Sequence, residues 1–519
     1  MSTELIEALL KPSAYPHPVE KIELLETHIS WVILTGERVY KIKKPMDFGF
    51  LNFTKLEDRK TFCELEMKLN QRLAPRLYDS VIPISGSPDN PILNDNTNPI
   101  EYAIVMHQFP QENMLDAISS SGKLTLEPLL DVAEQLADFH QNIEVSTSEQ
   151  HYGSAEHVWF PVKQNFDQIR PLLSQKQDLL QLDKLEQWAS ESYQSLLPLI
   201  RERKAEGFIK ACHGDVHLGN ITLFEDKVTL FDCIEFNEDF RWTDTMADLG
   251  FLCMDLDSRG LSHLSSSVVN RYMEINGDFR GLGLLNFYKA YRAVVRAKVV
   301  LFRLHGDDIT DPLRSEVLAE YRQYTDLAES YCTLEKPFLA MMQGLSGSGK
   351  TTAGRELVEH SNCVMLRTDI ERKRLFGLKP EASSHDAKLD IYTQEATDKT
   401  YLQIQSTARF LLSQGISVVI DGASLKLQER SLCCQPAIEL KIPYFIVKCM
   451  APDNVLKSRI IKRQFNNSDA SEATTDLIQQ QHQWEEPLSD HEEKHTIVLN
   501  TADKGWRKKL LSDLTDQLN

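Results

Sequence analysis

The sequence predicts two domains: an α+β domain, with a β-rich small lobe and a helical large lobe, followed by an α/β domain with a parallel sheet. The chain has 519 residues, which is too long for one ordinary hydrophobic core. The pattern of apolar residues also changes near Lys336, where long helical stretches give way to short apolar strands that alternate with helices. We therefore expect one domain over residues 1–333 and another over residues 334–519.

The first domain begins with β-rich sequence and continues with helices. Residues 28–43 read as two strands joined by a turn, residues 55–73 have a helical pattern, and residues 101–106 form a further strand. Apolar residues then recur at helical spacing over residues 126–143 and 184–204. This order predicts a small β-rich lobe before a larger helical lobe.

The second domain alternates strands and helices. Residues 336–360 read as a buried strand, a glycine-rich loop and a helix, and residues 415–424 and 442–452 each contain a further short apolar strand. Strands separated by helical stretches predict a parallel sheet with crossover helices.

The composition is that of a soluble globular protein, with 42% hydrophobic and 26% charged residues. A net charge of −19 lacks the basic footprint that a nucleic-acid backbone needs, which argues against a nucleic-acid partner. The N-terminal residues do not resemble a signal peptide, and no stretch approaches about 18 apolar residues, so we expect a cytoplasmic protein without membrane contact. The nine cysteines show no C-x-x-C pair and are expected to be buried free thiols. The sequence indicates no oligomeric state.

The string HGDVHLGN at residues 213–220 has the residue types of a phosphoryl-transfer loop. Asp215 could orient or deprotonate an acceptor hydroxyl, and Asn220 could hold a metal ion. A second metal-binding carboxylate should follow on a strand, and Asp232 comes directly after the apolar residues 228–231. The order His213, Asp215, Asn220, Asp232 is the order of a kinase catalytic loop and its magnesium aspartate.

On these residues, the segment 20–325 resembles the aminoglycoside phosphotransferase-like family, which has a protein-kinase-like fold. The resemblance implies ATP-dependent phosphorylation of a hydroxyl group, with Asp215 as the catalytic base and with Asn220 and Asp232 as Mg2+ ligands. In that family the position of Asp248 most often braces the catalytic loop. The absence of G-x-G-x-x-G from the small lobe is usual for its small-molecule kinases.

A kinase small lobe also needs a strand lysine for the α- and β-phosphates of ATP and a helix glutamate that holds this lysine. Lys41 and Lys43 lie on one face of their strand, and the resemblance favours Lys41 while Lys43 remains an alternative. On the following helix Glu66 best matches the family position, with Glu64 as the alternative.

The string GLSGSGKT at residues 344–351 fits G-x-x-x-x-G-K-[ST] and follows an apolar strand, which is where a phosphate-binding loop must lie. Its glycines let backbone N–H groups surround the phosphates, Lys350 reaches the outer phosphates, and Thr351 binds Mg2+. The expected nucleotide-binding residues are Gly344, Ser346, Gly347, Ser348, Gly349, Lys350, Thr351 and Thr352.

Four charged residues downstream of this loop suit phosphoryl transfer to a hydroxyl. Asp369, at a strand-to-helix transition, could receive the acceptor hydroxyl, and Asp421, at the end of an apolar strand, could contact Mg2+ or the acceptor. Arg459 and Arg463 lie four residues apart on one helix face, as in a lid over the transferred phosphate.

Residues 337–519 resemble the small P-loop kinases, which include polynucleotide 5′-kinase, gluconate kinase, chloramphenicol phosphotransferase and zeta-toxin-like enzymes. The resemblance is carried by GLSGSGKTT, RTDIERKRLFG, VVIDGAS and RIIKR. It implies an α/β P-loop NTPase fold and phosphoryl transfer from ATP or GTP to a small or nucleotide-like acceptor. The whole chain resembles a bacterial fusion of a phosphotransferase-like domain with a P-loop kinase domain.

The leading hypothesis is a bifunctional, ATP- and Mg2+-dependent phosphotransferase that acts on hydroxyl groups of small molecules and has one site in each domain. One alternative is a single catalytic kinase domain regulated by a partner domain that only binds nucleotide. Another is a second domain that phosphorylates nucleic-acid ends, although the sequence shows no aromatic and basic platform for such a strand.

The helix predicted over residues 284–304 carries four basic residues on related turns, namely Lys289, Arg292, Arg296 and Arg303. They indicate either a solvated basic face or a site that holds an anionic acceptor or an acidic surface through arginine side chains.

Overall fold

The computed structural model of the protein describes residues 3–47, 51–304, 310–333, 336–384, 386–466 and 470–518. The chain forms two compact units, one of residues 1–164 and 197–255 and the other of residues 165–196 and 256–519. Helices α5 (Ala155–Ile169), α6 (Lys176–Ala205) and α8 (Thr245–Ser258) contribute residues to both units. The expected domain boundary between residues 333 and 334 falls at Leu334 and Glu335, which lie outside the described residues.

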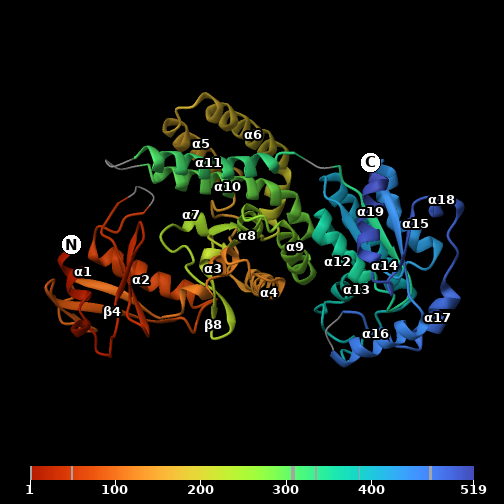
Figure 1. The fold of residues 1–519 in the computed structure, drawn as a ribbon, viewed down its shortest axis with the longest axis horizontal. Coiled ribbons are helices and arrows are strands. Elements are labelled where there is room, and N and C mark those ends of the chain that lie inside the picture. Colours follow the sequence, from red (N-terminus) through yellow and green to blue (C-terminus); the bar gives the residue numbers. More distant parts are fainter. Residues whose placement is uncertain are drawn as a thin grey trace. The chain divides into compact units, whose positions relative to one another are not determined.

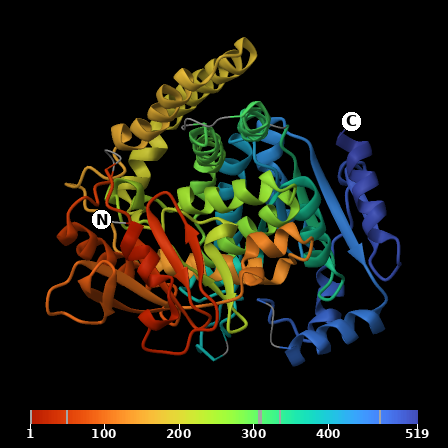
Figure 2. The ribbon, with the colours of Figure 1, turned by 60° about the vertical axis from the view of Figure 1, so that its left-hand side comes forward.

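The first unit contains an antiparallel sheet of six strands in the order β1-β2-β3-β6-β4-β5, drawn in red and orange in Figures 1 and 2. The strands are β1 (Glu23–Glu26), β2 (Ser30–Leu34), β3 (Arg38–Lys43), β4 (Tyr78–Ser87), β5 (Asn90–Leu93) and β6 (Glu101–His107). Helix α1 (Thr3–Leu9) packs on one face of the sheet with Tyr40 and Ile42 of β3. Helix α2 (Leu56–Asn70) covers the other face, where Cys63 packs with Val39. The period of two along β3 therefore turns Lys41 and Lys43 toward α2.

The rest of the first unit is mainly helical, as the sequence predicts. Its short strands form the antiparallel pairs β7 with β10 and β8 with β9. The remaining elements are α3 (Leu115–Ser120), α4 (Leu126–Asn142), β7 (Ile209–Ala211), β8 (Ile221–Phe224), β9 (Lys227–Leu230), α7 (Glu238–Arg241) and β10 (Trp242–Asp244). The segment 212–220 connects β7 to β8, and Asp232 follows β9, so both polar segments lie at the ends of these strands.

The second unit contains a sheet of five parallel strands in the order β12-β13-β11-β14-β15. These are β11 (Leu339–Gln343), β12 (Val364–Arg367), β13 (Val418–Asp421), β14 (Tyr444–Met450) and β15 (Thr496–Asn500). Helices α12 (Lys350–Ser361) and α19 (Trp506–Leu518) cover one face through a core that includes Met342, Leu357 and Leu514. Helices α14 (Gln394–Ser413) and α15 (Leu427–Leu440) pack together against β13, β11 and β14. The prediction of a parallel sheet with crossover helices is confirmed.

Helices α13 (Thr368–Leu375) and α16 (Asp453–Asn466) follow the strands β12 and β14 at the end of the sheet where the glycine-rich loop lies. Helix α17 (Leu477–Trp484) comes after α16, and α18 (Asp490–Glu493) precedes β15 at the opposite end of the sheet. The same unit contains the longer helices α9 (Ser262–Asn276), α10 (Leu285–Phe302) and α11 (Asp311–Ser330).

Helix α10 is not the solvated basic helix that the sequence also allowed. Lys289 and Arg292 are buried, and Lys289 Nζ lies 2.6 Å from Asp257 Oδ2. Arg303, just after the helix, lies 2.8 Å from Glu316 and 2.7 Å from Glu320 of α11. The hypothesis of a solvated face is therefore wrong for Lys289 and Arg292, whereas the side chain of Arg303 is 41% exposed.

All nine cysteines are free thiols, and eight of them are buried. Over the part of the chain that the structure describes, no helix is both long enough and apolar enough to cross a membrane.

Candidate active sites

The segment after β7 is held in place by two aspartates of α8. The carboxylate of Asp248 accepts hydrogen bonds from the backbone N–H groups of His213 and Gly214, each at 2.8 Å, and lies 3.2 Å from His140 Nε2. Burial alone would raise the pKa of Asp248, but the interactions with His140 and His213 hold it below its ordinary value. Asp255 Oδ2 accepts from the backbone N–H of Leu218 at 2.9 Å. Both ends of the loop are thus fixed from one helix.

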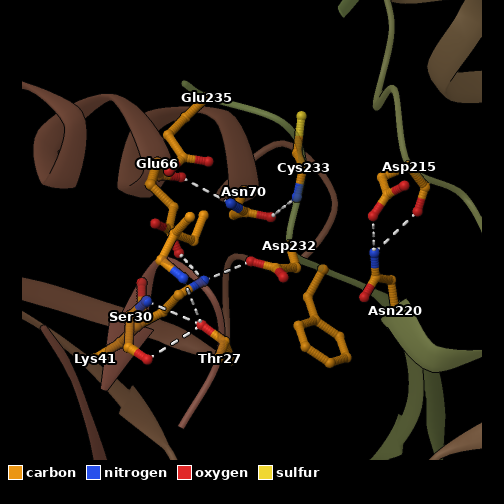
Figure 3. A network of polar contacts seen from close by, with 12 residues as sticks. Thr27, Ser30, Lys41, Glu66, Asn70, Asp215, Asn220, Asp232, Cys233 and Glu235 are labelled. Carbon is orange, nitrogen blue, oxygen red and sulfur yellow. Dashed lines mark hydrogen bonds and ion pairs between the residues drawn. The ribbon is translucent and has the colours of Figure 1, made fainter. Parts of the chain in front are cut away.

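This loop brings Asp215 and Asn220 together. Asn220 Nδ2 donates to Asp215 Oδ2 at 2.9 Å and to the Asp215 carbonyl oxygen at 3.0 Å (Figure 3). His217 Nε2 lies 3.4 Å from the same carboxylate oxygen. The Asp215 side chain remains 35% exposed, so a substrate hydroxyl could approach it.

Two lysines of β3 reach the same glutamate of α2. Lys41 Nζ lies 2.8 Å from Glu66 Oε1 and 2.6 Å from Asp232 Oδ1 (Figure 3). Lys43 Nζ lies 2.7 Å from Glu66 Oε2. Burial alone would raise the pKa of Glu66, but the two lysines hold it down at about 2. Glu64, by contrast, is 58% exposed. The geometry therefore favours Glu66 over Glu64 as the glutamate that pairs with the strand lysine. Of the two lysines, Lys41 is the one that also contacts Asp232.

Asp232 lies between the pair Asp215 and Asn220 and the pair Lys41 and Glu66 (Figure 3). Its backbone has a φ of +63°, in the left-handed region that non-glycine residues seldom adopt. The neighbouring backbone is fixed from both sides, because Cys233 N–H donates to Asn70 Oδ1 at 2.9 Å and Phe231 N–H donates to the Asn220 carbonyl oxygen at 3.0 Å. Such a residue is held against local strain by its surroundings, as is common at functional sites.

Glu235 is a member of this network that the sequence analysis missed. Its carboxylate pairs with Lys43 Nζ, and both side chains are buried. Burial raises the pKa of Glu235 to about 7; Lys43 opposes this rise and the nearby charge of Glu66 adds to it. The signal that could have found it is a second carboxylate three residues after Asp232, on the same segment that follows β9.

In the second unit, the glycine-rich loop wraps the end of β11 and leads into α12. Two of its glycines have no room for a side chain: a Cβ on Gly344 would lie 2.3 Å from the Cys449 carbonyl oxygen, and one on Gly347 would lie 2.7 Å from that of Leu456. Their φ angles of +143° and +80° also require glycine. The loop is thus fixed against β14 and α16.

Lys350 and Thr351, the last two residues of the glycine-rich motif, have different partners. Thr351 Oγ1 donates to Asp421 Oδ2 at 2.7 Å. Lys350 Nζ donates to the Leu345 carbonyl oxygen at 2.9 Å, which curls the lysine over its own loop. Burial lowers the pKa of Lys350, although the Asp421 carboxylate opposes that change.

A cavity of about 860 Å³ opens over this loop. It brings together most of the side chains that the sequence analysis selected in this half of the chain. They are Ser346, Gly347, Gly349, Lys350, Thr351, Thr352, Asp369, Asp421, Arg459 and Arg463. The two other expected loop residues, Gly344 and Ser348, are buried. The cavity is large enough for a nucleotide and a small acceptor.

The two arginines expected in a lid have different surroundings. Arg459 Nη1 donates to the Gly347 carbonyl oxygen at 3.1 Å and to Thr501 Oγ1 at 2.8 Å, so this guanidinium braces the glycine-rich loop. Arg463 Nη2 donates to the Ala473 carbonyl oxygen at 3.3 Å. Both side chains line the cavity.

Two further residues of this site were missed in the sequence. Gln481 of α17 accepts from the backbone N–H of Ser346 at 2.8 Å and donates to Ser346 Oγ at 3.1 Å, and Arg367 Nε lies 3.4 Å from Asp421 Oδ2. The position of Arg367, two residues before Asp369 at the end of a strand, is a signal that could have found it. Nothing in the local sequence around Gln481 indicates its contact.

Comparison with known proteins assigns each half of the chain. Residues 103–283 match the Phosphotransferase enzyme family, and residues 339–488 match a AAA domain. This chain joins a phosphotransferase domain to a P-loop domain. The fold described above agrees, since a kinase-like domain with an antiparallel sheet precedes a five-stranded parallel sheet. The two matches support domains of the phosphotransferase and P-loop kinase types.

The likeness to whole proteins extends over both domains. The chain is 29% identical over 477 residues to uncharacterized proteins of Mycobacterium bovis and Mycobacterium tuberculosis, covering 90% of this chain and 92% of each relative. It is also similar to a gluconokinase from Sinorhizobium meliloti, at 18% identity over 35% of this chain and 94% of that chain, with a TM-score of 0.28. A choline/ethanolamine kinase family protein from Mesorhizobium loti matches at 13% identity over 64% of this chain and 98% of that chain, with a TM-score of 0.40.

Proposed function

We propose that the chain is a bifunctional phosphotransferase that uses ATP and Mg2+ at two separate sites, each of which phosphorylates a hydroxyl group of a small-molecule acceptor. The observation that carries the proposal is that each unit holds its own set of phosphate-handling side chains. Asp215, Asn220 and Asp232 lie with Lys41 in the first unit. Lys350, Thr351 and Asp421 lie in the second.

In the phosphotransferase domain, Asp215 is proposed to accept the proton of the acceptor hydroxyl as that oxygen is phosphorylated. The side chains of Asn220 and Asp232 have the oxygen atoms that Mg2+ prefers, and Lys41, held by Glu66, can reach the α- and β-phosphates. Bound Mg2+-ATP would supply the phosphoryl group. The contact of Lys41 with Asp232 supports these roles, since it keeps the phosphate-binding and metal-binding groups within reach of each other.

In the P-loop domain, Thr351 and Asp421 are proposed to hold Mg2+, and Lys350 to neutralise the outer phosphates. Asp369 lines the same cavity and is the proposed acceptor-facing carboxylate. Arg463 and Arg459 stand along the cavity, where they can stabilise charge on the transferred group.

The test is to substitute one residue of each site in the full chain, as Asp215→Ala and as Lys350→Ala. Transfer of labelled phosphate from ATP is measured over a panel of hydroxyl compounds. We expect each variant to lose a different set of phosphorylated products by at least about a hundredfold. For Asp215→Ala the reason is the loss of general base catalysis, and for Lys350→Ala it is the loss of charge stabilisation on the phosphates. If either single substitution abolishes all nucleotide turnover, the two sites are not independent and the proposal fails.

A matched control is available for each site. Glu64→Gln changes an exposed carboxylate two residues from Glu66, and Glu381→Gln changes an exposed carboxylate in the second unit. Neither should alter the products formed. Loss of one product set in the control as well as in the site variant would show that the assay reports stability rather than chemistry.

A further inference from the structure

Helix α9 is buried on nearly every side, although it precedes the P-loop domain in the chain by about 60 residues. It packs beside α12 and the strand β12, as Figure 1 shows. Strand β12 is an edge strand of the parallel sheet, so its outer backbone groups need partners from outside the sheet.

The amide of Asn270 supplies those partners. Its Nδ2 donates to the Cys363 carbonyl oxygen at 2.9 Å, and its Oδ1 accepts from the Met365 backbone N–H at 2.7 Å. These two backbone groups are the ones that a neighbouring strand would use. Helix α9 thus closes the edge of the sheet with one side chain.

Helix α9 also makes specific contacts at its C-terminal end, with α13. Arg374 of α13 donates to the carbonyl oxygens of Met273 and Glu274 at 3.2 and 3.0 Å, which satisfies backbone acceptors at the C-terminus of α9. The residue that follows the helix, Gly277, has no room for a side chain, because a Cβ there would lie 2.4 Å from Arg374 Nη1. The end of α9 is therefore fitted to this arginine.

A chain of polar contacts leads from α9 into the P-loop cavity. Glu274 Oε1 lies 3.2 Å from Arg367 Nη1, Arg367 Nε lies 3.4 Å from Asp421 Oδ2, and that oxygen accepts the hydroxyl of Thr351 at 2.7 Å. Glu274, Arg367 and Asp421 are all buried, so their charges act on one another with little screening by water.

We propose that Glu274 and Arg367 are positioning residues of the P-loop site, and that through them helix α9 sets how tightly Mg2+ binds at Asp421. The inference rests on the proposed function of that site. Arg367 competes with a cation for the carboxylate of Asp421, and Glu274 offsets part of the arginine charge. Helix α9 is then part of the site, although the family match of the P-loop domain begins only at residue 339.

The two residues carry opposite charges and so make opposite predictions. In Glu274→Gln less of the charge of Arg367 is offset, so we expect the Mg2+ concentration for half-maximal nucleotide binding to rise by about fivefold. In Arg367→Gln the competing cation is removed, and that concentration should fall by a similar factor. A residue that only supported the fold would not shift the Mg2+ requirement in opposite directions.

The experiment titrates Mg2+ into the full chain with a fluorescent ATP analogue and takes the part of the signal that Lys350→Ala abolishes as binding at the P-loop site. Glu439→Gln is the matched control, because Glu439 is 42% exposed and its ion pair, with Arg409 at 2.7 Å, involves neither Glu274 nor Arg367. It should leave the Mg2+ requirement unchanged. Glu274→Asp keeps the charge and should also remain near the wild-type value, which separates loss of charge from misfolding.

The outcomes are distinguishable. Opposite shifts in Glu274→Gln and Arg367→Gln support the inference. Equal shifts, or none, while Lys350→Ala still removes binding, would overturn it and leave the proposed function standing. If Lys350→Ala removes no binding at all, the proposed function of this site is wrong and the inference falls with it.

Discussion

Buried charges of opposite sign are concentrated around Glu66 in the phosphotransferase domain. Lys41 and Lys43 contact one oxygen each of its carboxylate, and each lysine also reaches a further carboxylate, Asp232 or Glu235. Removing one partner from such a group leaves an uncompensated buried charge, which is more costly than losing an exposed ion pair. The two ends differ in exposure, since Asp232 is 42% exposed and Glu235 is buried. The Asp232 end can therefore be reached from solvent, whereas the Glu235 end is enclosed by protein.

At the residue scale, Glu235 should make the stability of this domain depend on pH. Its pKa is raised to about 7 in the folded chain, so its contribution to stability is greatest below the ordinary glutamate pKa and is lost as the pH rises to about 7. Over that window the free energy of unfolding should fall by on the order of 3 kcal/mol. The glutamine in Glu235→Gln cannot ionise, so the free energy of unfolding of this variant should not show that fall. The difference in stability between the variant and wild type should therefore shift in favour of the variant between pH 5 and pH 8.

Thermal unfolding of both proteins at pH 5 and pH 8 measures this difference. Glu64→Gln, which removes an exposed carboxylate from the same helix as Glu66, serves as the control and should follow wild type. An identical pH dependence in wild type and Glu235→Gln would show that Glu235 keeps an ordinary pKa.

At the scale of elements, the periodic patterns and short motifs were sufficient for much of the fold. The period of two along β3 predicted that Lys41 and Lys43 share a face, and the glycine string predicted a loop between a strand and a helix. Contacts between elements that are distant in sequence were not predictable. Lys43 and Glu235 are 192 residues apart, and Glu274 and Arg367 are 93 apart, so no local pattern links them. Helix α9 likewise carries no motif that indicates a sheet edge as its partner.

The junction of α9 with β12 predicts a specific cost for the loss of one amide. Asn270→Ala leaves the Cys363 carbonyl and the Met365 N–H buried without this partner, which should lower the free energy of unfolding by about 1–3 kcal/mol for the groups left unsatisfied. Ser266→Ala, one turn earlier on the same helix, removes a hydroxyl that contacts Asn362 and the Ser262 carbonyl oxygen but leaves the edge of β12 untouched, so it should cost less. Urea unfolding of the two variants provides the comparison. Equal effects would mean that Asn270 contributes no more than the hydroxyl contacts of Ser266.

At the scale of the whole molecule, the two compact units do not coincide with the two family matches. The phosphotransferase match covers residues 103–283, whereas residues 256–283 belong to the same compact unit as the P-loop domain. Helix α9 lies before the sequence change near Lys336, and it packs with β12 and α12. The P-loop domain therefore depends on residues that precede the sequence change near Lys336.

This arrangement predicts the behaviour of a chain cut between its domains. A specific protease site inserted between residues 333 and 336 would break the covalent link but leave the contacts of Asn270, Glu274 and Arg374 intact. After cleavage at micromolar concentration we expect the two fragments to elute together in gel filtration, because polar contacts and apolar burial along α9 still hold them.

Combining Asn270→Ala with Arg374→Ala should release the fragment that begins at residue 336, since the edge of β12 and the end of α9 both lose their partners. The matched control combines Ser266→Ala with Glu381→Gln, which changes two side chains at the same junction without touching these backbone contacts. Separation of the fragments in the cleaved wild-type protein would show that the P-loop domain is self-contained, with α9 resting against it too weakly to complete the sheet.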